Sequence, residues 1–239
     1  MPTRVLSLAA CRASASLAPP SLRAQFSAAL TDDAAQDAES LRALTSWPVP
    51  REVDGGACSS RPGDTVPFDA LRGEYGEAAP AVDARAPRVR RLARLAALMR
   101  ALAASTGADW LGVYRVVARG GGATALQKEA YVGSPSRAFF PLTAAFAAHS
   151  NNSAVALSCC ARLIDDAHAL GDDDAYYVCD ARVRSELCAP IVSASGDVIG
   201  IIDAEAFNAG HFSDPARAAA VLLACELLGE CDLLRALLA

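Results

Sequence analysis

The sequence predicts an α+β fold, in which an antiparallel sheet is flanked by N- and C-terminal helices. Apolar residues recur at helical spacing over 83–107 and again after 213, while several runs between them alternate with a period of two. The chain has 239 residues, of which 53% are apolar, so a sizeable core is expected. No apolar run reaches the roughly 18 residues of a membrane span, so the sequence predicts no membrane contact.

The charge balance and the cysteines exclude several classes of protein. With 22 basic and 27 acidic residues, the formal net charge is −5, which argues against nucleic-acid binding. The 8 cysteines form no Cys-x-x-Cys pair, so neither a zinc site nor a thioredoxin-type motif is predicted. The acidic run Asp172–Asp174 matches the spacing of no standard metal site, and we expect a solvated loop there.

Residues 1–31 contain arginines and no acid, which is the composition of an organellar transit peptide. Cleavage would fall before Asp32, and the peptide would direct the chain to a mitochondrion or a plastid. The alternative is a disordered tail on a cytoplasmic protein. Residues 32–82 are predicted to hold a short helix over 32–47 and an irregular Gly- and Pro-rich linker over 48–82. The folded domain is expected over 83–239.

The first elements of that domain follow from local signals. Apolar residues at three- or four-residue steps predict a helix from Asp83, with Pro87 in its first turn and Gly107 at its C-terminal cap. Alternation then predicts a strand beginning at Trp110 and a second strand over 124–132, separated by a glycine turn.

The second half is predicted in the same way, as a short helix within 139–149, strands over 162–165, 186–193 and 198–205, and a long C-terminal helix. Ser213, Asp214 and Pro215 open that helix, with Ser213 as its cap. A four-residue loop at 194–197 joins the last two strands, which sets Ser193 opposite Val198.

This register places an acid cluster on one face of the hairpin. Glu186 lies opposite Glu205, and Cys188 lies opposite Asp203, so that all four side chains share a face. Like charges directly opposite one another destabilise a sheet, so at least one carboxyl is expected to keep its proton near neutral pH. A retained carboxylic proton is what a general acid requires. The alternative is a solvated face on which the acids do nothing.

Cys179 lies seven residues before Glu186, in a polar segment that could hang over the same pocket. A thiol beside a proton donor suits redox chemistry on a polar acceptor. The alternative is an inert, small apolar side chain. Arg137 could bind a substrate carboxylate bidentately, but an exposed loop arginine is the expectation we favour.

Three segments together resemble a GAF domain, and more narrowly the free methionine-(R)-sulfoxide reductases of that family. They are Trp110-Leu111-Gly112-Val113-Tyr114, Cys179-Asp180 followed by Ser185-Glu186, and Gly200-Ile201-Ile202-Asp203-Ala204-Glu205. The resemblance covers residues 86–238. It implies a GAF fold, reduction of free methionine sulfoxide to methionine, no metal, no organic cofactor, and recycling by thioredoxin.

The resemblance also implies residue roles. Cys179 would be the nucleophile, and Glu186 and Asp203 would bind the substrate and its sulfoxide oxygen. Glu205 stands where the family usually has Asp, which keeps the charge on a longer arm. Trp110 and Tyr114 match the aromatic residues that line the family's pocket.

The chain departs from the family pattern at the cysteines that usually lie upstream. The corresponding segment, Tyr131–Val155, contains none. Because Cys188, Cys159 and Cys160 are not expected to meet Cys179, we predict that an external, thioredoxin-like thiol reduces the oxidised nucleophile directly. The same departure keeps open a second function, a non-catalytic sensor GAF domain that binds a small molecule. A homodimer is one option for the oligomeric state.

Overall fold

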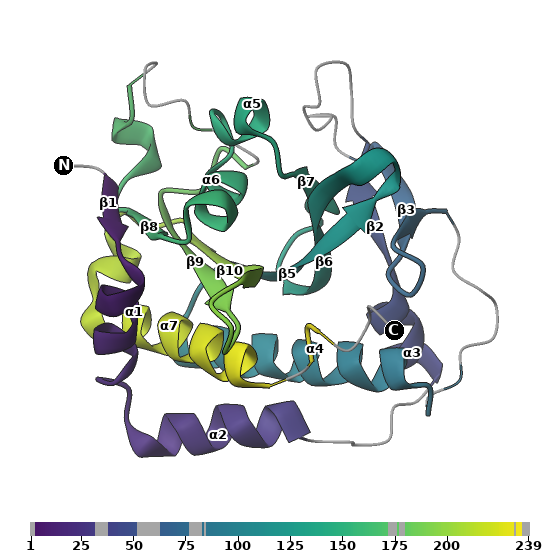
Figure 1. The fold of residues 1–239 in the computed structure, drawn as a ribbon, viewed down its shortest axis with the longest axis horizontal. Coiled ribbons are helices and arrows are strands. Elements are labelled where there is room, and N and C mark those ends of the chain that lie inside the picture. The colour runs from purple at the N-terminus through teal and green to yellow at the C-terminus, as the bar shows by residue number, and fades with distance from the viewer. Residues whose placement is uncertain are drawn as a thin grey trace.

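The computed structural model describes residues 3–31, 38–51, 63–76, 83, 85–171, 176, 180–231 and 233–235. A seven-stranded sheet, in which every neighbouring pair is antiparallel, lies at its centre (Figure 1). The strand order is β1-β8-β9-β10-β5-β6-β7. The strands are β1 (Thr3–Leu6), β5 (Trp110–Arg119), β6 (Ala123–Val132), β7 (Phe139–Pro141), β8 (Ala161–Ile164), β9 (Ser185–Val192) and β10 (Val198–Ala206). The predicted α+β fold with an antiparallel sheet is confirmed.

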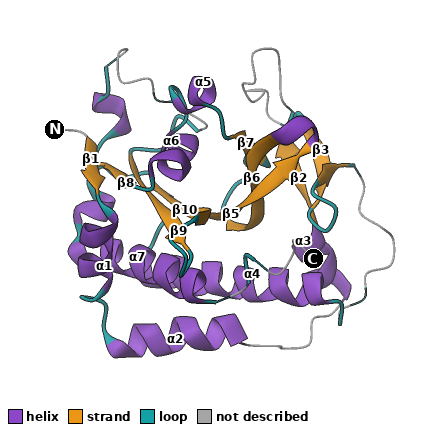
Figure 2. Cartoon of the chain, viewed as in Figure 1, coloured by secondary structure: helices purple, strands orange, loops and turns teal. Residues whose placement is uncertain are grey.

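Helices cover both faces of this sheet (Figure 2). α4 (Pro87–Thr106) and α7 (Pro215–Glu230) pack on one face, and α6 (Asn151–Ser158) packs on the other. α2 (Pro20–Thr31) forms an outer layer against α4 and α7. The shorter helices are α1 (Leu8–Ala15), α3 (Ala38–Thr45) and α5 (Ala144–Ala147). In the described part of the chain, no helix combines the length and the apolar character needed to cross a membrane.

α4 follows the sequence signals closely. Pro87 occupies its first turn, and Gly107 ends it in the left-handed conformation at φ 67°, which glycine adopts without steric cost. Its buried face includes Leu95, Met99 and Leu102, which belong to the main core between the sheet and the helices. The predicted helix and its C-terminal end at Gly107 are therefore confirmed, whereas its start lies at Pro87 rather than at Asp83.

The β9–β10 hairpin confirms the register where it matters for the site. Glu186 pairs with Glu205 and Cys188 pairs with Asp203. The prediction is wrong only beside the turn, where Val198 pairs with Val192 rather than with Ser193. An irregularity between Val198 and Gly200 absorbs one residue of β10, and bulges of this kind are common at hairpin ends.

The cap of α7 differs from the prediction by one residue. The carboxylate of Asp214, not the hydroxyl of Ser213, accepts the backbone N–H groups of Ala216 and Arg217, at 2.9 and 3.1 Å. Ser213 instead accepts a hydrogen bond from Arg4 at 2.7 Å and donates one to Asp165. The Ser213 hydroxyl is thus hydrogen-bonded to Arg4 of β1 and to Asp165, which follows β8.

The N-terminal residues are part of the folded structure. β1 pairs with β8 at the sheet edge, and α1 packs on α7. Phe26 and Leu30 of α2 are buried in the main core. The alternative of a disordered tail is therefore wrong for residues 3–31, because their apolar side chains complete the outer layer. Organellar targeting stays a prediction.

The predicted linker over 48–82 also contains regular structure. β2 (Ser46–Pro50), β3 (Thr65–Asp69) and β4 (Glu74–Tyr75) form a separate three-stranded sheet. Residues 52–62 and 77–82 lie outside the described part, as do 32–37 of the predicted 32–47 helix, whose remainder contains α3. The sequence also left β7 and α6 unassigned. α6 has few large apolar residues, so it carries no clear stripe.

Candidate functional site

A cavity of about 110 Å³ lies above the β9–β10–β5 part of the sheet, beside the first turn of α6. Its lining includes the carboxyls of Glu186, Asp203 and Glu205 and the rings of Trp110 and Tyr114. Glu205 pairs with Trp110 across β10 and β5, so these two side chains come from adjacent strands. The structure thus brings together five of the six residues that the sequence singled out.

The sixth residue, Cys179, lies outside the described residues, and its role stays a prediction. The next residue, Asp180, lines the cavity. Cys188 shares the sheet face with the acids but is fully buried, and burial raises the pKa of its thiol well above the ordinary value. A thiol that is held protonated is a poor nucleophile, so Cys188 does not substitute for Cys179.

Amide and phenol groups hold two of the carboxyls in place. Asn152 donates from Nδ2 to Asp203 Oδ2 at 2.9 Å, and Asn151 donates from Nδ2 to Glu186 Oε1. The hydroxyl of Tyr176 donates to Glu186 Oε2. Such contacts fix the direction in which each carboxyl faces the cavity.

The sequence reasoning missed both asparagines because α6 was unassigned. They are the first two residues of that helix, where the N-cap Ser150 accepts the backbone N–H of Ser153. A serine at the start of a short helical window was the available signal. Their approach to β9 and β10 depends on tertiary packing across the sheet, and local pattern does not report that.

Burial keeps protons on this acid cluster. Burial raises the pKa of Glu186, although hydrogen bonds from Tyr176 and Asn151 oppose the rise. The pKa of Asp203 is raised well above its ordinary value by burial, then by the charges of Glu186 and Glu205. Burial, followed by the charges of Glu186 and Asp180, raises the pKa of Glu205 to about 8. These directions agree with the expectation of a proton-holding carboxyl near neutral pH.

Two buried acceptor atoms in the described part of the site have no hydrogen-bond partner. They are Asp203 Oδ1 and Asn151 Oδ1, on side chains that line the cavity. Unmet polar atoms at a cavity surface are costly unless a ligand or water meets them. A protonated Asp203 would present its free oxygen as a donor, while the amide oxygen of Asn151 can only accept.

The expectation of an exposed Arg137 is wrong. Its side chain is buried against the cavity, where Nε donates to the carbonyl of Phe139 at 2.7 Å. The guanidinium also lies 5.2 and 5.1 Å from the ring centroids of Phe140 and Phe146. Stacking between aromatic rings gives a buried guanidinium a favourable environment, and no local pattern signalled it.

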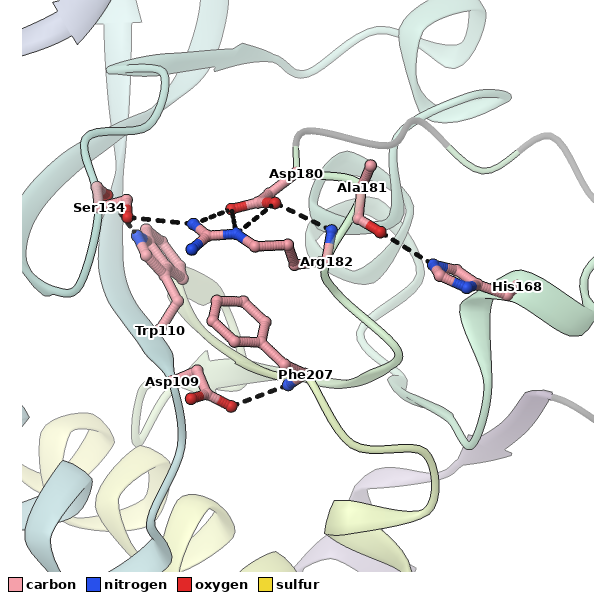
Figure 3. Close-up of polar contacts among 8 residues, drawn as sticks. All are labelled: Asp109, Trp110, Ser134, His168, Asp180, Ala181, Arg182 and Phe207. Atoms are coloured by element: carbon pink, nitrogen blue, oxygen red, sulfur yellow. Dashed lines mark hydrogen bonds and ion pairs between the residues drawn. The ribbon is translucent and has the colours of Figure 1, made fainter. Parts of the chain in front are cut away.

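The rim of the cavity is tied together by polar contacts (Figure 3). Trp110 donates from Nε1 to the carbonyl of Ser134 at 2.9 Å, which orients the indole ring. Arg182 contacts both Asp180 and the hydroxyl of Ser134. The loop after β6 and the segment before β9 therefore meet above the acids.

Among the described residues, one group has three possible metal-ligand side chains together. Donor atoms of Glu186, Cys188 and Asp203 lie within 4.8 Å of one another. A bound cation would have to displace the protons that burial keeps on these groups. We therefore assign no metal, and we interpret the group as a cluster of proton donors.

The geometry defines an α+β domain with a small polar cavity between an antiparallel sheet and one short helix. Residues 90–229 match the family model of the GAF domain, and the chain belongs to that family. None of the curated proteins compared with the chain matches it.

Solved structures are similar to the chain in fold. A type II free methionine-R-sulfoxide reductase from Thermoplasma acidophilum matches with a TM-score of 0.52 at 21% identity, over 63% of this chain and 96% of that one. A protein described as a GAF sensor from Burkholderia vietnamiensis has a TM-score of 0.48 at 25% identity, over 59% and 80%. A free methionine-R-sulfoxide reductase from Neisseria meningitidis has a TM-score of 0.45 at 21% identity, over 58% and 79%.

Proposed function

We propose that the chain reduces free methionine-(R)-sulfoxide to methionine. The observation that carries the proposal is the convergence of Glu186, Asp203, Glu205, Trp110 and Tyr114 on one cavity. These are the residues that the reductase motifs single out, and the carboxyls among them have raised pKa values. The GAF fold alone would be equally consistent with ligand binding without catalysis.

The reaction moves one oxygen atom and two electrons. The thiolate of Cys179 attacks the sulfoxide sulfur while the carboxyls of Glu186 and Asp203 hold the oxygen and protonate it. Methionine leaves with its sulfur reduced, and Cys179 is oxidised to a sulfenic acid that carries the oxygen. Two equivalents of an external thiol then restore Cys179, forming a disulfide and releasing water.

The cavity suits a small zwitterion. Its volume of about 110 Å³ corresponds to roughly four water molecules at about 30 Å³ each, so the cavity admits only a small ligand. The unpartnered Asp203 Oδ1 can donate to a sulfoxide oxygen when it is protonated, and Asn151 Oδ1 can accept from an ammonium group. Trp110 and Tyr114 supply apolar surface for the methylene and methyl groups.

The test is a coupled assay with NADPH, thioredoxin reductase, thioredoxin and free methionine-(R)-sulfoxide. Turnover by the wild type that is lost in Cys179→Ser is the expected result. Turnover no higher than that of Cys179→Ser would overturn the proposal. Trapping with dimedone after one equivalent of substrate should label Cys179, because we expect direct reduction by an external thiol.

A second candidate function is a non-catalytic GAF domain that binds a small amine or amino acid. The absence of cysteines from Tyr131–Val155 favours it, because the family's upstream thiols have no counterpart there. Thermal shift with methionine, its sulfoxides and cyclic nucleotides tests it. A ligand that stabilises wild type and Cys179→Ser equally, without any turnover, would favour the sensor.

A further inference from the structure

Arg182 contacts three residues at the rim of the cavity, which are Asp180, Ser134 and Phe207 (Figure 3). Its Nε lies 3.0 and 3.1 Å from the two carboxylate oxygens of Asp180, and its Nη2 lies 2.6 Å from Oδ2. The backbone N–H of Arg182 also donates to Asp180 Oδ1 at 2.9 Å. Nη2 reaches Ser134 Oγ at 3.4 Å, and the guanidinium lies 4.5 Å from the ring centroid of Phe207. We call these four residues the rim clamp.

The rim clamp joins three segments that are far apart in sequence. Ser134 follows β6, Asp180 and Arg182 precede β9, and Phe207 follows β10. The two outer anchors are themselves fixed near the start of β5. Ser134 accepts from the indole of Trp110 at 2.9 Å, and the backbone N–H of Phe207 donates to Asp109 Oδ2 at 2.8 Å. Arg182 thus links the segment before β9 to a fixed frame, in addition to the hydrogen bonds of the Ala181 carbonyl with His168 at 3.0 Å and of the Arg184 N–H with the Ala206 carbonyl at 2.9 Å.

An exposed ion pair is weak by itself, and Arg182 is well exposed, at 59% of its side chain. A planar guanidinium that binds a carboxylate through two nitrogens and stacks on a ring is restricted in several directions at once. The neighbouring pair Arg184–Asp166 provides a comparison inside the same segment. It is also bonded through two nitrogens, at 2.8 and 2.5 Å, but neither residue lines the cavity.

We infer that Arg182 is a positioning residue, which fixes Asp180 and the rest of the segment 180–184 at the cavity rim. In the sequence, Asp180 directly follows Cys179, the proposed nucleophile. The inference rests on the proposed function for its catalytic consequence. A nucleophile displaced by about 1 Å can lose on the order of a hundredfold in rate, so holding its neighbour matters.

The experiment compares Arg182→Ala, Arg182→Lys and the matched control Arg184→Ala by two measurements. The rate of amide hydrogen exchange at residues 182 and 183 measures how firmly the segment 180–184 is held, and this measurement needs no turnover. Steady-state kinetics with free methionine-(R)-sulfoxide measure the effect of each substitution on kcat and KM. For Arg182→Ala we expect exchange several-fold faster and kcat about tenfold lower, with KM changed less than about twofold because the acids that hold substrate are on β9 and β10.

Arg182→Lys should fall between the wild type and Arg182→Ala, since it keeps the charge but not the planar fork. Arg184→Ala should match the wild type in both measurements. Unchanged exchange in Arg182→Ala overturns the inference, and so does a loss of equal size in Arg184→Ala. A lower kcat without faster exchange also overturns it, because Arg182 would then act on substrate. If the wild type has no turnover, the proposed function fails, and the exchange result alone decides whether the rim clamp holds the segment.

Discussion

Glu186 is the carboxyl with the most contacts at the site, since it accepts hydrogen bonds from both Asn151 and Tyr176. Glu186→Gln preserves the size of the side chain but removes the acid, so we expect kcat to fall by about 10²–10⁴ with the fold intact. The measurement is the coupled assay, with circular dichroism as a check of folding. Glu226→Gln, on α7 and paired with Arg23 away from the cavity, is the control. Equal activity in Glu186→Gln and the wild type would contradict the role.

Glu205 makes stability depend on pH. Its pKa is about 8 in the folded protein against an ordinary value of 4.5, through burial and the charges of Glu186 and Asp180, opposed by Lys128. Between these values the folded state binds more protons than the unfolded state, so the free energy of unfolding falls as pH rises. Glu205→Gln removes this proton uptake. Near pH 4.5 the variant and the wild type should have the same free energy of unfolding. Near pH 8 the free energy of unfolding of the variant should be higher by about 1–2 kcal/mol, a figure reduced because Glu205 is partly exposed.

Urea unfolding of both proteins at several pH values measures this difference. Parallel pH profiles for the wild type and Glu205→Gln would show that Glu205 titrates normally in the folded protein. Because Asp203 and Glu186 are coupled to Glu205, the difference between the two proteins reports the titration of the whole carboxyl cluster rather than that of Glu205 alone.

At the scale of residues, the sequence predicted the acids but not the groups that hold them. The register of one hairpin was enough to place Glu186 opposite Glu205, because strand pairing has a period of two. Asn151, Asn152 and the buried Arg137 reach the cavity only through the packing of other segments against the sheet. Contacts between distant segments leave no periodic signal in the chain.

At the scale of elements, α7 packs against β9 so closely at Gly229 that there is almost no space for a side chain between the two backbones. A Cβ on this residue would lie 2.2 Å from the carbonyl oxygen of Val192. Alanine favours a helix by up to about 1 kcal/mol over glycine, but a backbone clash of this kind costs more. We expect Gly229→Ala to lower the free energy of unfolding by about 1–3 kcal/mol.

Denaturant unfolding measures the change, and Gly120→Ala is the control, since nothing lies within 4 Å of its Cβ position. A Gly229→Ala protein as stable as the wild type would show that α7 can shift away from β9 without cost. The contact is specific to packing, because helix propensity alone predicts the opposite sign.

Elements with strong periodicity were predicted correctly, as were the short α5 and β8, whereas β1, β2, β3, β4, β7 and α6 were not. α4 has Pro87 in its first turn, Gly107 as its C-terminal cap and a long apolar stripe, so the helix and its C-terminal end could be predicted. β2 and β3 contain the paired prolines Pro48 and Pro67, which are typical of a linker because proline cannot donate to a strand pair. These prolines are accommodated in a small sheet whose Trp47 and Phe68 pack in an apolar cluster.

At the scale of the whole molecule, residues 1–31 combine two properties. Their acid-free, arginine-bearing composition predicts organellar import, and their folded form closes the outer layer over α4 and α7. A fluorescent fusion of residues 1–40 tests import. Accumulation in a mitochondrion or a plastid would support the prediction, and a diffuse cytosolic signal would remove it.

The contribution of this outer layer to stability is concentrated in α2. Phe26 is fully buried in the main core, whereas Leu17, between α1 and α2, is 69% exposed. Removing a buried phenyl ring leaves a cavity in addition to the lost transfer free energy, so Phe26→Ala should cost about 3–5 kcal/mol. Leu17→Ala removes a similar apolar side chain from an exposed position and should change stability by about 0.5 kcal/mol or less. Urea unfolding of the full chain separates the two. Equal, small effects would mean that α2 does not pack on α4 and α7 in solution, and the chain beyond residue 31 would then hold its fold without it.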